Sequence, residues 1–316
     1  MSQVLTVGEA LGLLSPHRVG PIMTHSGLEF GVAGAEMNVA IGLSRLGIAV
    51  EYWGAVGADP PGRAIRSTLL AEGVGVGQLI DLPHPTGLFM KEWYGLENEP
   101  NVYYYRSDSA MRRWRLPEDF IHRVNGIQWL HLSGISWILS ESLAENLTRL
   151  ARHFQQHSRT VSLDFNVRRK LASLEAWSEA MRHALTFATV VMASPDELRW
   201  LWGTDDLGVL WQDQVMTGNQ VWVVKEGTTR TVAYQHGHQI GEAPTITVPR
   251  IVDVVGAGDG FAAGVIAGRL HQMTWDQALD LGNVVGAYAV SHAGDWEGYP
   301  DWDMVRAYRQ NTHIDR

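Results

Sequence analysis

The segment Asp253–Gly264, DVVGAGDGFAAG, joins a strand-like stretch, TITVPRIVDVV (245–255), to the apolar run VIAGRL, which is typical of a helix. Glycine in such a turn lets the backbone approach a ligand with no Cβ in the way. The N–H groups of Gly256, Ala257 and Gly258 would then point at a ligand from the positive end of a helix, where anions bind. The segment therefore predicts an anion hole at a strand-to-helix turn.

Asp259 lies inside this turn, where a passive anion cradle gains nothing from a carboxylate. A catalytic site does gain, because the carboxylate can accept a proton from a substrate hydroxyl while neighbouring amides stabilise a transferring phosphoryl group. Two alternatives stay open. Asp259 can simply complement the helix dipole, or Gly258, Gly260 and Ala263 can form the GxGxxA fingerprint of a dinucleotide-binding protein. The fingerprint is weaker, because it usually follows the first strand of its domain.

The overall charge and composition restrict the class of partner. The 316 residues include 25 lysines and arginines against 34 acidic residues, for a net charge of −9, and no cysteine. An acidic chain without a long basic block is a poor nucleic-acid binder, and the lack of cysteine removes disulfides and thiolate metal sites. We find neither an export signal nor a run of 18 apolar residues. We therefore expect a cytoplasmic protein that acts on small molecules, with no nucleic-acid or membrane partner.

Short apolar runs alternate with helical patterns along the chain. The runs are VLTVG (4–8), VEYWGAVG (50–57), WLHLSG (129–134), TVSLDF (160–165), TVVMAS (189–194) and VWVVK (221–225). Continuous apolar strands are typical of a sheet covered on both faces, and their alternation with helices predicts right-handed βαβ units and a parallel sheet. Two segments, about residues 10–30 and 86–110, do not follow this alternation of strands and helices. They predict a small β-sheet lid. We expect residues 1–316 to form one α/β domain.

Two segments resemble the signatures of the ribokinase-like (PfkB) carbohydrate kinases. IVDVVGAGDGFAAG (251–264) is similar to their second signature, DTxGAGD, and Gly34–Gly47, GAEMNVAIGLSRLG, is similar to their first. The resemblance implies a three-layer α/β fold with a mostly parallel central sheet and a small β-sheet lid, in a homo-oligomer that uses ATP and Mg²⁺. Asp259 would activate a sugar hydroxyl, and the amides of 256–258 would hold the γ-phosphate. Taken alone, Gly34–Gly47 also fits an ordinary amphipathic helix closed by glycine.

Two further segments, YYYRSDSA (103–110) and DFNVRRKL (164–171), resemble those of the 2-keto-3-deoxygluconate kinases in this family. Two arginines in one pocket would suit a carboxylate, which guanidinium groups bind bidentately. The resemblance implies phosphorylation of 2-keto-3-deoxygluconate to 2-keto-3-deoxy-6-phosphogluconate. It places these residues around the substrate: Gly34, Asn38, Phe89, Tyr104, Tyr105, Arg106, Arg168 and Asp295. A kinase of a neutral sugar, of the fructose or ribose type, and a non-catalytic sugar-binding protein remain alternatives.

The resemblance also implies a nucleotide side of the site. It places nucleotide contacts at Asn166, Arg168, Ser194, Lys225, Gly227, Gly256, Gly258 and Asn283. Glu197 would influence Mg²⁺ through water, and Asp253 would contact a monovalent cation. The chain has Ser194-Pro-Asp-Glu197 where the family often has Asn-x-x-Glu, and Phe89 where tyrosine is frequent. Ordinary structural roles remain open, since Lys225 can simply flank a strand.

Overall fold

The computed structural model describes residues 2–18, 20–23, 25–93, 100–217 and 219–314 of the chain. Residues 19, 24 and 94–99, which belong to the two expected lid segments, lie outside the described residues. None of the helices in the described ranges combines the length and apolarity needed to cross a bilayer.

A nine-stranded sheet forms the centre of the molecule, in the order β13-β12-β11-β10-β9-β8-β1-β4-β5. Its strands are β1 Val4–Val7, β4 Val50–Gly57, β5 Gly75–Leu82, β8 Trp129–Ser133, β9 Thr160–Asp164, β10 Val190–Ala193, β11 Val221–Glu226, β12 Arg230–Gln235 and β13 His238–Pro244. The strands from β5 to β11 pair in parallel, and β12 and β13 extend one edge antiparallel. The apolar runs therefore form a mostly parallel sheet, as expected, because both of its faces are buried.

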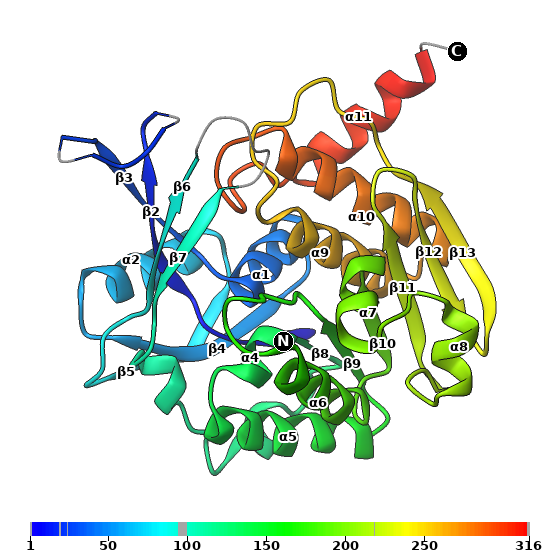
Figure 1. The fold of residues 1–316 in the computed structure, drawn as a ribbon, viewed down its shortest axis with the longest axis horizontal. Coiled ribbons are helices and arrows are strands. Elements are labelled where there is room, and N and C mark those ends of the chain that lie inside the picture. The colour runs from blue at the N-terminus through cyan, green and yellow to red at the C-terminus, as the bar shows by residue number, and fades with distance from the viewer. Residues whose placement is uncertain (1, 19, 24, 94–99, 218, 315–316) are drawn as a thin grey trace.

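Helices cover both faces of this sheet, so that the molecule has three layers (Figure 1). One face packs against α1 Ala35–Arg45, α2 Pro60–Ala71, α9 Ala257–Leu270, α10 Trp275–Val290 and α11 Trp302–Ile314. The other face carries η1 Ala110–Arg113, α3 Phe120–Arg123, α4 Gly134–Ile138, α5 Glu141–Gln156, α6 Leu174–Leu185, α7 Pro195–Trp202 and α8 Leu207–Gln212. The stripe of Leu143, Leu147 and Leu150 on α5 is buried, as helical spacing predicts. The expected α/β fold class is confirmed.

A second sheet stands off the main body, at the upper left of Figure 1. It has four strands in the order β3-β2-β6-β7, with bounds β2 Leu11–Pro16, β3 Leu28–Ala33, β6 Leu88–Glu92 and β7 Asn101–Tyr105. Its inner face carries a small apolar cluster that includes Leu11, Leu13 and Phe89. Side chains alternate between the faces of a strand. Tyr104 accordingly packs toward this cluster while Tyr105 is 63% exposed.

The segment that leads into α9 differs from the sequence prediction. The strand-like stretch 245–255 contains no strand, because β13 ends at Pro244 and the chain then runs irregularly to α9. Proline at position 249 has no N–H to donate to a ladder, and the N–H of Val252 donates instead to the carbonyl of Val290 at the end of α10 (2.7 Å). The prediction of a strand here was wrong, and Ile251 and Val252 are exposed rather than buried.

Gly256 makes the turn into α9 possible. It is the N-cap of the helix, with a left-handed φ of 84°. A Cβ on Gly256 would lie 1.8 Å from the carbonyl oxygen of Asp295, so both the backbone angle and the space require glycine. Gly258, two residues later, is already helical, and a Cβ there would meet only Lys225 Nζ at 3.8 Å.

Alanine at these two glycines should therefore have opposite consequences for stability. Gly256→Ala is expected to lower the free energy of unfolding by more than about 2 kcal/mol, through left-handed strain and a backbone clash. Gly258→Ala, the matched control, should leave it unchanged or slightly raised, because alanine favours helix over glycine. Denaturant unfolding of both variants measures the difference. Equal stability of the two variants would contradict the requirement for glycine at the turn.

Candidate active site

A cleft of about 530 Å³ lies at the carboxyl ends of the parallel strands, where the first turn of α9 meets the inner face of the small sheet. Strand β1 is flanked by β8 on one side and β4 on the other, so the chain crosses over in both directions from it. Ligands of open α/β sheets bind at such a switch point, outside the carboxyl ends of the strands. The lining includes Glu9 after β1, Asp164 at the end of β9, Ser194 after β10 and Lys225 on β11.

The carboxylate of Asp259 is held between two side-chain amides. Asn38 on α1 donates from Nδ2 to Asp259 Oδ2 at 2.8 Å, and Asn166, just after β9, donates from Nδ2 to Oδ1 at 3.1 Å. Asn38 is fixed in turn because its Oδ1 accepts the N–H of Gly34 (3.3 Å). Asn166 has a left-handed φ of 46°, which asparagine tolerates better than most residues. Both amides therefore orient Asp259, although Asn166 was expected on the nucleotide side.

The pKa of Asp259 is raised from 3.8 to about 7, chiefly by burial. The hydrogen bond from Asn38 opposes this shift and the negative charge of Asp164 adds to it. Asp259 is 7% exposed. A carboxylate with a pKa near neutrality can both accept and release a proton under physiological conditions, which suits a general base.

Backbone amides and a lysine ammonium lie near Asp259. The N–H groups of Gly256 and Gly258 donate no hydrogen bond within the described part of the chain, as expected for the first turn of a helix. Lys225 Nζ lies beside Gly258 and contacts Asp164 Oδ1 at 2.9 Å. Burial disfavours its ammonium, but the charges of Asp164 and Glu197 outweigh burial and raise the pKa of Lys225. Free amides beside a lysine ammonium are groups that can bind an anion.

Glu197 is engaged in a helix cap. Its Oε1 accepts the N–H of Val167 (2.8 Å), and its Oε2 accepts the N–H (2.8 Å) and the hydroxyl (3.0 Å) of Ser194, in a capping box at the start of α7. Ser194 and Glu197 both line the cleft. Within the described ranges, no three Asp, Glu or His side chains gather as a metal site. The carboxylate of Glu197 thus has a structural role whether or not it acts on a metal.

With Phe89 and Tyr104 on the small sheet and Asp295 against Gly256 before α9, the expected substrate residues lie on more than one side of the cleft. Gly34, Phe89, Tyr104, Arg106, Arg168 and Asp295 all line it. Arg106 is buried, forms an ion pair with Glu9 and stacks over the ring of Tyr104, with Cζ 5.5 Å from the ring centroid. Its Nε is buried and has no hydrogen-bond partner among the described residues. This buried donor is available to a ligand that supplies an acceptor.

Three expected contacts lie away from the cleft. Tyr105 points to the outer face of the small sheet, because it alternates with Tyr104 along β7. Gly227 lies in the turn between β11 and β12. Asn283 on α10 is buried, and its Nδ2 donates to Thr231 Oγ1 (3.2 Å) and to the carbonyl of Pro244 (2.9 Å). Asn283 thus ties α10 to the edge strands, so its amide donors are already used.

Residues that the sequence analysis overlooked complete the charge pattern. Glu9 pairs with Arg106, and Lys91 on β6 contacts both Asp253 and Asp295. A signal for Lys91 was present, because it lies two residues after Phe89 and strand alternation places both side chains on the same face. Both are indeed buried. A monovalent cation at Asp253 would therefore compete with the ammonium of Lys91, which already contacts this carboxylate.

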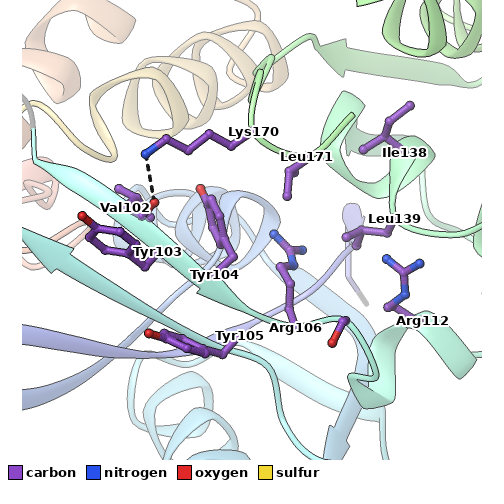
Figure 2. A pocket seen from close by; sticks show the side chains of 11 residues that line it. Val102, Tyr103, Tyr104, Tyr105, Arg106, Arg112, Ile138, Leu139, Lys170 and Leu171 are labelled. Carbon is purple, nitrogen blue, oxygen red and sulfur yellow. Dashed lines mark hydrogen bonds between the residues drawn. The ribbon is translucent and has the colours of Figure 1, made fainter. Parts of the chain in front are cut away.

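A second hollow of about 540 Å³ adjoins the cleft and shares Val102, Tyr104, Arg106 and Lys170 with it. Figure 2 shows Lys170 reaching from the loop after β9 to the carbonyl of Val102 on β7, at 3.3 Å. The side chains of Tyr103 and Tyr105 lie apart from Arg106 in the same view. The small sheet is thus joined to the body of the molecule on this side as well.

The raised pKa of Asp259 predicts a pH-dependent cost to stability. Between about pH 4 and about pH 7 the folded chain keeps a proton on Asp259 that the unfolded chain has lost, so the free energy of unfolding falls as pH rises through this window. Asp259→Asn cannot ionise and should lose this dependence. Its melting temperature relative to the unsubstituted protein should therefore increase from about pH 5 to about pH 8. Calorimetry tests this, with exposed Asp213→Asn as control, and a difference constant across pH would refute it.

Comparison with known proteins agrees with this geometry. The model of the pfkB family carbohydrate kinases matches residues 1–302. A 2-dehydro-3-deoxygluconokinase from Bacillus subtilis is 30% identical, over 96% of this chain and 94% of its own. A fructokinase from Klebsiella pneumoniae is 28% identical, over 96% and 98%.

A solved structure has the same fold. It is a candidate ribokinase II from E. coli in complex with ATP and Mg²⁺, with a TM-score of 0.86 and 21% identity, covering 98% of this chain and 100% of that one. The matched residues contain Asp259, its two amide partners and the turn before α9. The chain therefore belongs to the pfkB family of carbohydrate kinases and is a sugar kinase.

Proposed function

We propose that the protein transfers the γ-phosphoryl group of ATP to a hydroxyl of 2-keto-3-deoxygluconate, giving 2-keto-3-deoxy-6-phosphogluconate. The observation that carries the proposal is the position of Asp259. Its carboxylate, with a pKa of about 7, lies one residue from a free helix-terminal amide and is oriented by Asn38 and Asn166. Proton removal and charge stabilisation can therefore act in one small volume.

In the proposed reaction a carboxylate oxygen of Asp259 accepts the proton of the substrate hydroxyl. The hydroxyl oxygen then bonds to the γ-phosphorus of ATP, while the bond between this phosphorus and the leaving oxygen of ADP breaks. The N–H groups of Gly256 and Gly258 and the ammonium of Lys225 stabilise negative charge on the transferring group. The N–H of Ala257, also expected in the anion hole, already donates to the carbonyl of Val254 at 3.4 Å. Mg²⁺ would further neutralise the phosphates. Since Glu197 is engaged by three donors, we infer that phosphate oxygens and water would supply most of the ligands of this ion, as is usual for Mg²⁺.

The proposed sugar acid is supported by the cations on the substrate side. The unpaired Nε of Arg106 is buried at the cleft, and a substrate carboxylate would supply the acceptor that it lacks. Arg168 lines the same cleft. The Bacillus subtilis relative, named for this substrate, agrees. We also propose that the small sheet acts as a lid, which would exclude water and so limit ATP hydrolysis.

A neutral sugar is the second candidate, and one contact favours it. Glu9 forms an ion pair with Arg106, so the pair as a whole carries no net charge and offers less attraction to a carboxylate. The Klebsiella pneumoniae relative is named a fructokinase. The two candidates share the same base and anion hole and differ only in what Arg106 binds.

Asp259→Asn should lower kcat by on the order of 10² to 10⁴ with little change in the KM for sugar. Asn38→Ala keeps the base but removes a hydrogen bond that favours its ionised form, so the acidic limb of the kcat profile should move to higher pH. A coupled assay of ADP release over a range of pH measures both effects. Near-normal turnover in Asp259→Asn would reject the assignment of the base.

A panel of sugar acids and neutral sugars, assayed with ATP and Mg²⁺, tests the substrate. Arg106→Met combined with Glu9→Gln removes the pair without leaving a buried charge. This variant should raise the KM for 2-keto-3-deoxygluconate by on the order of tenfold to a hundredfold, with the KM for ATP unchanged. Glu9→Gln alone, which retains the arginine, is the matched control. If the protein prefers a neutral sugar, and the KM for that sugar is the same in the double variant as in the unsubstituted protein, the second candidate is favoured.

A further inference from the structure

Lys91 is a buried ammonium with no assigned part in the reaction. Its side chain is 1% exposed and projects from β6 of the small sheet toward the main body. The Nζ atom lies 2.9 Å from Asp253 Oδ2 and 2.5 Å from Asp295 Oδ1. Both carboxylates are themselves almost fully buried. A buried charge is costly unless it is paired, so this three-residue cluster is a constrained arrangement.

Asp253 and Asp295 both contact the turn that leads into α9. Asp253 precedes the turn, and its Oδ1 accepts the N–H of Val255 at 3.0 Å. The backbone of Asp295 lies directly against Gly256, because its carbonyl oxygen fills the place where a Cβ would stand. Asp295 also lines the cleft. A displacement of either carboxylate would therefore shift the amides that follow Asp253.

The charges explain why an ammonium is needed here. Asp253 and Asp295 would repel each other across a poorly solvated gap if nothing positive lay between them. Burial raises the pKa of Asp295, and the ammonium of Lys91 opposes that shift. The negative charges of Asp295 and Asp253 more than compensate for burial and raise the pKa of Lys91. The ammonium of Lys91 thus supplies the positive charge that lies between the two carboxylates.

We propose that Lys91 is a positioning residue that serves as a tethered monovalent cation: its ammonium draws Asp253 and Asp295 together and so fixes the anion hole. The inference rests on the proposed kinase function of the turn. Because Lys91 belongs to the small sheet, the anion hole takes its shape only when this sheet is seated. The unsubstituted protein then needs no dissolved monovalent cation at this place.

Lys91→Met removes the charge and keeps most of the side-chain volume. We expect kcat to fall by about a hundredfold, the order expected when reacting groups are misplaced by about 1 Å, with a much smaller change in the KM for sugar. In Lys91→Ala the two carboxylates would border a space that a free cation can enter. Ammonium, methylammonium or potassium, compared with choline at equal ionic strength, should then restore part of kcat.

A second measurement does not depend on activity. A cation that binds the folded Lys91→Ala protein should raise its melting temperature, whereas the melting temperature of the unsubstituted protein should not distinguish potassium from choline. Arg66→Met, which removes an exposed ion pair with Asp81, is the control and should gain no cation response. If Lys91→Ala does not fold, Lys91→Met/Asp253→Asn removes one charge of each sign, and its melting temperature should exceed that of Lys91→Met.

The outcomes separate the two proposals. Lack of phosphoryl transfer to every sugar tested, with the cation-dependent melting of Lys91→Ala intact, rejects the proposed function and keeps the tethered cation. Normal kcat in Lys91→Met rejects the role of Lys91. So does a potassium requirement in the unsubstituted protein, or a Lys91→Ala protein whose melting and turnover ignore the cation. If neither Lys91→Ala nor the double variant folds, Lys91 is a folding residue and the positioning role is rejected.

Discussion

The site depends on the burial of one carboxylate at the start of a helix. Asp259 is removed from water by α1, the loop after β9 and α9 together. Burial raises the pKa of Asp259 because it disfavours the ionised form, and the hydrogen bond from Asn38 opposes this shift because it favours that form. The resulting balance leaves the carboxyl group able to change state near neutral pH. The surrounding helices and strands keep water away from the carboxyl group of Asp259.

This arrangement lowers the stability of the folded chain. A buried ionisable group and an arginine donor without a partner among the described residues each lower the stability of the folded state. Both lie at one cleft, as is common for unsatisfied and perturbed groups in functional sites. The large apolar clusters on both faces of the sheet offset these costs from a distance.

Periodic features of the sequence predicted the fold well, and pairwise contacts could not be predicted from it. Continuous apolar runs became the central strands, and the glycine-rich turn became the N-terminus of α9, because backbone geometry depends on local residue types. The stretch 245–255 has strand-like residues but contains a proline and lies beyond the edge strand, so composition alone was misleading. Partners such as Lys91 with Asp253, separated by 162 residues, depend on how two sheets meet. Likewise, Glu9 beside Arg106 only became visible once β1 and β7 were placed together.

The chain contains 22 arginines and only three lysines, Lys91, Lys170 and Lys225. Lys170 and Lys225 line the cleft, and Lys91 contacts an aspartate that does. Away from the cleft, the positively charged side chains are therefore arginines. Their guanidinium groups stay protonated and do not react as nucleophiles under mild conditions. Apart from the terminal amine, a reagent selective for primary amines would modify this protein only around its cleft. Covalent amine labelling would thus act as a local probe of cleft occupancy, with most of the exterior left unmodified.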